Sequence, residues 1–137
     1  MRYFGLVFIF LALILSGCSQ NAAQSAGSGT SDPSAIIGDV TRGQTIFARG
    51  TNGAPACSSC HPVSSGGFAL GPVMSGIAER AATRVEGLTA EQYLHQSIVD
   101  PAAHVVSGYR PIMYPGYAKV LSEQDIADVI AYLLTLK

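Results

Sequence analysis

The sequence predicts that residues 39–137 form an all-α domain, with three to four short helices joined by long loops. Three segments place apolar residues at helical spacing behind a residue of the kind that caps a helix N-terminus. No segment shows the alternation of apolar and polar residues that is typical of a half-buried strand. A chain of 137 residues has room for one such domain.

The first residues resemble an export signal that ends in a lipid anchor. Arg2 precedes an apolar stretch, Tyr3 to Leu15, which is shorter than the roughly 20 residues that span a bilayer. The following Leu15-Ser16-Gly17-Cys18 resembles the box at which bacterial lipoproteins are cleaved and acylated. We therefore predict a lipoprotein signal peptide at 1–17 and lipidation of Cys18. An ordinary signal peptide and a retained transmembrane helix are the alternatives.

Residues 18–38 are predicted to be a flexible tether between this anchor and the domain. Ser, Ala, Gly, Gln and Asn dominate Ser19 to Ile37, which contains no aromatic residue. Such a segment cannot bury enough apolar surface to become ordered. The expected protein is thus exported, attached to a membrane by its lipid, and carries its domain on the extracytoplasmic (periplasmic) side.

The first two helices of the domain are expected at Asp39 to Arg49 and at Val73 to Arg84. Asp39 is a suitable N-cap for the first, and Gly50-Thr51-Asn52-Gly53 ends it. The second is a short helix that follows the Gly- and Pro-rich stretch 64–72.

The last two helices carry stronger signals. In Thr89 to Val99, Thr89 and Gln92 form a capping box, and Asp100-Pro101 ends the helix. In Ser122 to Thr135, Ser122 is the expected N-cap, with Asp125 at the position that completes a box. The apolar residues of this helix recur at the helical period: Ile126, Val129, Ile130, Leu133 and Leu134.

Charge composition argues against one class of partner. Eight Lys and Arg residues stand against nine Asp and Glu residues, so the formal net charge is −1. Proteins that bind nucleic acid neutralise its phosphates with an excess of basic side chains. We therefore expect no nucleic acid partner.

The most informative motif is Cys57-Ser58-Ser59-Cys60-His61, the C-x-x-C-H pattern of c-type haem attachment. Two thiols at this spacing can reach the two vinyl groups of one porphyrin, and His61 then lies beneath the iron. The motif predicts one covalent haem c, which would also enlarge an otherwise thin core. The alternatives are a thioredoxin-like redox pair, a zinc site completed by His95 or His104, and a plain disulfide.

The second axial ligand of the iron is predicted to be Met113. This residue lies in a loop stiffened by Pro111 and Pro115, far enough from the first ligand to reach the opposite face of a haem. His104 is the main competitor, followed by Met74, whereas His95 is expected at the surface of its helix. An open sixth position would instead suit ligand binding or peroxidase-like chemistry.

From Gly38 to Lys137 the chain resembles a class I monohaem cytochrome c, and in particular the cytochrome c domains of bacterial haem–copper oxidase subunit II. The resembling segments are Gly43 with Phe47, Cys57 to His61, Leu70-Gly71-Pro72, Ser97 to Pro101, the Met113 loop, and Leu121-Ser122 to Leu133. The resemblance implies the class I cytochrome c fold, with helices and long loops wrapped around one covalent haem c. It also implies that Gly43, Phe47 and Tyr132 meet where the first and last helices cross, and that the Pro72 carbonyl accepts a hydrogen bond from His61. Tyr114 stands where relatives often carry a proline.

This likeness implies an electron carrier and not an enzyme. A single His61/Met113-ligated haem would pass one electron at a time between respiratory or photosynthetic complexes. The expected partners are a quinol-oxidising donor and an oxidase or reaction-centre acceptor. The alternatives are a haem subunit of a larger oxidoreductase, a peroxidase-like or gas-binding protein with an open sixth position, and a sensor. The expected apolar pocket residues are Phe68, Leu70, Val73, Ile77, Leu94, Ile98, Ile112 and Leu121.

Overall fold

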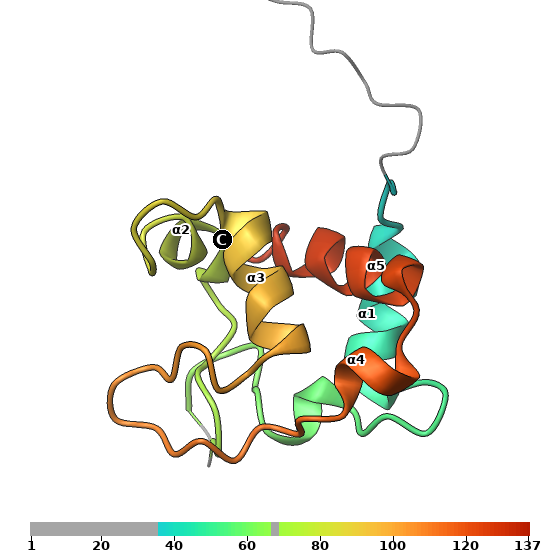
Figure 1. The fold of residues 1–137 in the computed structure, drawn as a ribbon, viewed down its shortest axis with the longest axis horizontal. Helices are drawn as coiled ribbons and strands as arrows, with labels where there is room; N and C mark the ends of the chain where they lie inside the picture. Colours follow the sequence, from blue (N-terminus) through green and yellow to red (C-terminus); the bar gives the residue numbers. More distant parts are fainter. Residues whose placement is uncertain (1–35, 67–68) are drawn as a thin grey trace, which may run out of the picture. The chain divides into compact units, whose positions relative to one another are not determined.

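The computed structural model describes residues 36–66 and 69–137, which contain helices and loops and no strand (Figure 1). The predicted all-α class is therefore confirmed, with more elements than expected. The elements are α1 (Val40–Arg49), the 3₁₀ turn η1 (Cys57–Ser59), α2 (Ile77–Ala81), α3 (Ala90–Val99), α4 (Tyr117–Val120) and α5 (Glu123–Leu133).

Three N-terminal predictions lie outside the described residues, namely the signal peptide, Cys18 and most of the tether, and so does the pocket residue Phe68. Within the described ranges, no helix combines the length and the hydrophobicity needed to cross a membrane.

Three helices begin where their caps predict. The Asp39 side chain accepts a hydrogen bond from Arg42 N at 2.9 Å and starts α1. Thr89 and Gln92 form a reciprocal capping box at α3. Ser122 forms the equivalent box with the third residue of α5. These caps satisfy the free N–H groups of each first turn, so the helix starts are determined locally.

The helix predicted from Val73 to Arg84 is mostly wrong, because α2 covers only Ile77–Ala81. Gly76 has a φ of +70°, a left-handed conformation that cannot continue a right-handed helix, so α2 starts after it. Conversely, no pattern in the sequence predicted α4. Its four residues are too few for a periodic pattern, and it is held by tertiary contacts of the buried Tyr117.

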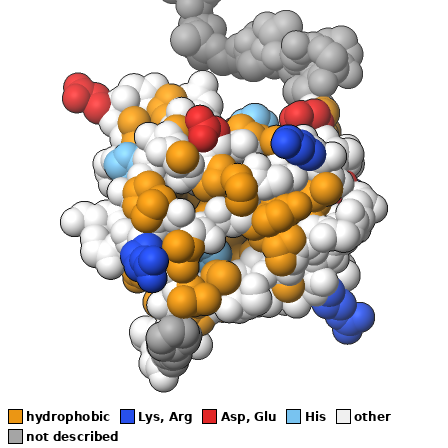
Figure 2. All heavy atoms as spheres, turned by 60° about the horizontal axis from the view of Figure 1, so that its bottom comes forward, with side chains coloured by type: hydrophobic (Ala, Val, Ile, Leu, Met, Phe, Trp, Pro, Cys, Tyr) orange, Lys and Arg blue, Asp and Glu red, His pale blue; other side chains and the backbone are white. Residues whose placement is uncertain are grey.

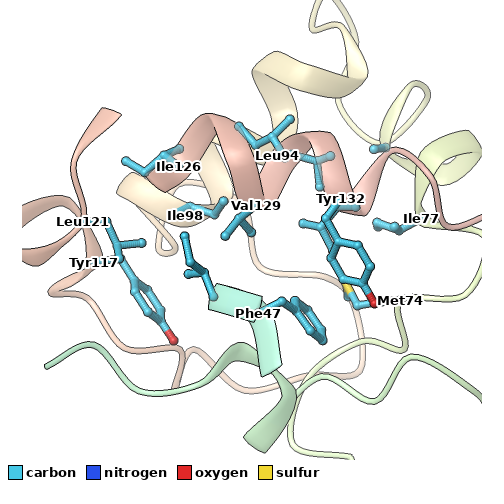
Figure 3. Packing of buried hydrophobic residues seen from close by; sticks show 14 of the residues in the cluster. Phe47, Met74, Ile77, Leu94, Ile98, Tyr117, Leu121, Ile126, Val129 and Tyr132 are labelled. Carbon is cyan, nitrogen blue, oxygen red and sulfur yellow. The ribbon is translucent and has the colours of Figure 1, made fainter. Parts of the chain in front are cut away.

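The core lies where α1 crosses α5 (Figures 1 and 3). A Cβ atom on Gly43 would overlap the backbone carbonyl of Asp128, so only glycine permits this close approach. Beside the crossing, the Phe47 and Tyr132 ring centroids are 5.4 Å apart at a tilted angle of 57°. This is the arrangement that the family resemblance implies, and both rings are buried in the core.

A partly buried ionic network reinforces the same crossing. The Arg42 guanidinium pairs with both Asp125 and Asp128, whose side chains are almost fully buried. The Asp39 backbone N–H donates to Asp128 Oδ1 at 2.8 Å, and Gln124 Nε2 donates to the same oxygen at 2.7 Å. Each buried carboxylate thus receives several donors, as a buried charge requires.

These contacts lower the pKa of both buried aspartates. Burial by itself would raise each pKa, but the donors outweigh it: mainly the Ser122 hydrogen bonds at Asp125, and the Asp39 N–H, Gln124 and Arg42 at Asp128. A carboxyl group with a lowered pKa in the folded state stabilises the fold above its unfolded pKa. That contribution is lost as the pH falls through the folded value.

We therefore expect the free energy of unfolding to fall as the pH is lowered from about 5 toward 3, near and below the ordinary aspartate pKa. Asp128→Asn should cost about 1–3 kcal/mol at pH 7 and flatten this pH dependence, since one lowered pKa is removed. Urea unfolding at a series of pH values measures both effects. Glu86→Gln, at an exposed turn residue, is the control and should show the same pH dependence as the parent protein. If the free energy of unfolding depended equally on pH in the parent and both variants, the lowered pKa of Asp128 would be contradicted.

Candidate functional site

An apolar pocket lies between the helices and the long loops. Its walls come from α1, the Cys57–His61 stretch, residues 70–77, α3, the loop 101–113 and α5. On the face formed by the bottom of Figure 1, hydrophobic side chains gather together, with few charged groups among them (Figure 2). The described lining residues include no aspartate or glutamate.

The turn η1 presents both thiols and the following imidazole to this pocket. Cys60 N and His61 N both donate to the Cys57 carbonyl, at 3.1 and 3.0 Å, and this folds the motif into a tight turn. Ser58 Oγ donates to the Ala48 carbonyl at 3.2 Å and ties the turn to α1. As a result Cys57, Cys60 and His61 all line one cavity.

The two cysteines do not form a disulfide, although both face the pocket. Burial raises the pKa of the Cys57 thiol to about 11. Reactive cysteines of thioredoxin-like pairs have lowered pKa values instead. The geometry therefore favours neither the redox pair nor the disulfide considered from the sequence.

A short loop fixes the His61 ring. His61 Nδ1 lies 2.9 Å from the Pro72 carbonyl oxygen, which can only accept, so Nδ1 carries the proton and Nε2 is left to bind a metal. Gly71 N donates to the Cys60 carbonyl at 3.0 Å, and Met74 N donates to the Pro62 carbonyl at 2.8 Å. The imidazole is thus oriented by backbone on its outer side.

Arg80 braces this loop from α2. Its Nη2 donates to the Val73 carbonyl at 2.6 Å, and its Nη1 donates to the Ser75 carbonyl. The Val73 carbonyl directly follows the Pro72 acceptor of His61, and the Ser75 carbonyl comes two residues later. No local pattern in the sequence indicates this role, because it depends on where the start of α2 packs.

The pocket also gathers three of the candidate sixth ligands. Met113 is half-buried and reaches the pocket from the loop that precedes α4. Met74 lines it as well, on the segment that holds His61. His104 lines it too, with its ring edge-on to Tyr93 at a centroid distance of 5.9 Å. His95 does not line it; its Nε2 lies 3.5 Å from Glu123 Oε2 on the exposed side of α3.

A family model of cytochrome c matches residues 40–137. The chain belongs to the cytochrome c family. No individual curated protein gives a significant match to it. Membership makes the domain a haem-based electron carrier with covalently bound haem c as its cofactor. The residues present fit that group, because two thiols, an oriented imidazole and apolar walls meet in one pocket.

The rival zinc site gains no support from the cytochrome c domain. Across residues 36–66 and 69–137, no group of three or more His, Cys, Asp or Glu side chains is placed to hold a metal ion.

Most, but not all, of the expected pocket residues line the haem pocket of this cytochrome. Those that do are Leu70, Ile77, Leu94, Ile98 and Ile112. Val73 and Leu121 do not: Arg80 binds the backbone of Val73, and Leu121 packs into the core beside α4. Phe47, Val129 and Leu133 also line the pocket, although they were expected only at the helix crossing or in the helical pattern of α5.

Two tyrosines connect the Met113 loop of the cytochrome to its cysteine motif. Tyr117 is buried in α4 and its hydroxyl donates to the Pro55 carbonyl at 3.1 Å. Burial raises the pKa of this phenol, so it remains protonated as a donor. Tyr114, the residue after Met113, packs edge-on against Tyr117 with centroids 5.1 Å apart. Tyr114, at the position where a proline was expected, thus contributes an aromatic contact.

Proposed function

We propose that this cytochrome c is a membrane-tethered, single-haem electron carrier whose iron is bound by His61 and Met113. When bound, the haem supplies an iron that alternates between ferrous and ferric states. The observation that carries the proposal is the shared pocket, which brings the oriented His61 ring and the Met113 loop together. Cys57 and Cys60 are the proposed attachment points.

Met113 is preferred to Met74 and His104 because of its position in the chain. Met74 belongs to the segment that contacts the His61 side of the pocket, through the Pro62 carbonyl. His104 is engaged with Tyr93. Met113 lies on a loop of separate origin, which the Tyr114 and Tyr117 contacts hold against the pocket. A sulfur ligand there would close the iron to other ligands and favour the ferrous state.

The rim of the pocket fits a transient redox partner. Six described lining residues are also exposed to solvent, and all but Arg110 are apolar or aromatic: Leu70, Val105, Tyr109, Arg110, Pro111 and Ile112. With a formal net charge of −1, strong electrostatic steering is not expected. We propose small docking interfaces, below about 1,200 Å², with a quinol-oxidising donor and an oxidase or reaction-centre acceptor.

Titration of the reduced protein with carbon monoxide tests the closed iron. We expect little binding at concentrations that saturate haem proteins with an open sixth position, because the Met113 sulfur has to be displaced first. Stoichiometric binding would contradict the proposed ligation and favour the peroxidase-like or gas-binding alternative.

The proposed anchor is a lipid on Cys18 in an exported protein, with the following residues to 38 as a tether. Cys18→Ser should move the cytochrome from the membrane fraction to the soluble extracytoplasmic fraction while its haem spectrum stays unchanged. Acylation of a lipoprotein cysteine supplies two or three acyl chains, and two are enough to anchor a protein stably. Because Cys18→Ser would remove all of them, we expect nearly all of the cytochrome to leave the membrane fraction. Retention of Cys18→Ser in the membrane fraction after a high-salt wash would contradict lipid anchoring.

A further inference from the structure

Arg84 has a buried donor without a partner. It lies in the turn after α2 and lines the apolar pocket. Among the described residues, its Nε is the single buried side-chain nitrogen or oxygen that lacks a hydrogen-bond partner. An unsatisfied N–H of a charged group is costly to bury, by at least about 1–3 kcal/mol, so the site calls for an acceptor.

Two other arginines of the domain have partners for their guanidinium groups. Arg80, one turn earlier, donates to the Val73 and Ser75 carbonyls. Arg42 pairs with two buried aspartates. Arg110 also lines the pocket but is exposed, so water can satisfy its donors. Among the arginines that the structure describes, only Arg84 combines a pocket position with a buried, unpaired N–H.

The described lining of the pocket contains no carboxylate that could act as the acceptor. The missing anion has therefore to come from the molecule that fills the pocket. Haem carries two propionate carboxylates in addition to its apolar ring. A guanidinium is well suited to such a group, because its planar donors match carboxylate geometry and it stays charged at all physiological pH values.

We propose that Arg84 is the charge partner of a haem propionate and donates to it through Nε. The proposal rests on the haem of the proposed function and adds a binding residue for the carboxylate end of that group. It has a redox consequence. A fixed positive charge close to the iron disfavours the ferric state, which carries one more positive charge than the ferrous state, and so raises the midpoint potential.

The midpoint potential of haem-loaded variants tests this charge. Arg84→Gln should lower the potential, and Arg84→Lys, which keeps the charge, should restore most of the difference. Arg49→Gln removes an exposed arginine at the end of α1 that does not line the pocket, and should leave the potential unchanged. Equal shifts for Arg84→Gln and Arg84→Lys, or none for either, would overturn the charge partnership.

A second measurement uses the unaltered protein, so that it does not depend on a variant folding. In the haem-loaded cytochrome labelled with ¹⁵N-arginine, the Arg84 Nε–H should exchange with solvent about tenfold more slowly, or slower still, than that of Arg49, because it is buried and bonded. Exchange as fast as that of Arg49 would overturn the proposal. A preparation that holds no covalent haem, or that binds carbon monoxide fully, would instead refute the proposed function.

Discussion

Replacement of Met113 by alanine is expected to lower the midpoint potential on the order of 0.1 V or more, within the range of about 0.8 V that axial ligands span. The thioether sulfur stabilises ferrous iron, whereas water or another side chain that replaced it as a ligand would not do so to the same extent. The weak long-wavelength absorption of a ferric haem with a sulfur ligand should disappear. Redox titration and absorption spectroscopy of the purified variant measure both changes.

Met74→Leu is the matched control. Met74 lines the same pocket and is buried, but this change conserves its volume and should cost less than about 1.5 kcal/mol. The potential and the long-wavelength band should be retained. If Met113→Ala kept both features and Met74→Leu lost them, Met74 would be the ligand. If the parent protein lacked the sulfur band and neither substitution changed its potential, His104 would be the next ligand to test.

Gly71→Ala is expected to disturb the His61 ligand directly. A Cβ atom at residue 71 would lie 2.7 Å from His61 Nδ1 and 2.9 Å from Nε2, closer than any ordinary contact. The ring would have to move, which would break its 2.9 Å hydrogen bond to Pro72 and tilt the metal-binding nitrogen. We expect a loss of about 1–3 kcal/mol in the free energy of unfolding and a fraction of protein with altered iron spin state.

Pro72→Ala separates crowding from hydrogen bonding at this ligand. It keeps the carbonyl that accepts from His61 and adds no atom near the ring, so the haem spectrum should remain close to that of the parent. Thermal unfolding and the absorption spectrum of the haem-loaded variants provide the comparison. A normal spectrum and stability for Gly71→Ala would show that the loop can shift away from His61, contrary to our expectation.

Local patterns predicted α1, α3 and α5 correctly because their signals lie within a few residues. The Thr89–Gln92 and Ser122–Asp125 capping boxes are formed by side chains three positions apart, and the structure contains both. The prediction was mostly wrong for the segment 73–84, because the left-handed conformation of Gly76 delays the helix start to Ile77. It missed α4, whose Tyr117 is held by Pro55, far away in the sequence.

The candidate site also contains features that the sequence predicted and features that it did not. The cysteine motif and its adjacent histidine could be read from spacing alone, since the chemistry of attachment dictates that spacing. The position of Pro72 beside His61 came from the family resemblance, and the structure places the two 2.9 Å apart. The roles of Arg80 and Arg84 had no signal, because an arginine in a short helix or turn looks like an ordinary surface residue.

Sequence alone therefore determined the class of the domain, the starts of its three longer helices and the kind of group it binds. Each of these depends on residues that are neighbours along the chain. Tertiary structure alone decided that Asp125 and Asp128 are buried ion-pair partners of Arg42, that Gly71 leaves room for the His61 ring, and that the Arg84 Nε is buried without a partner. Burial and close approach arise only when distant segments pack together, so no pattern along the chain could have predicted these contacts.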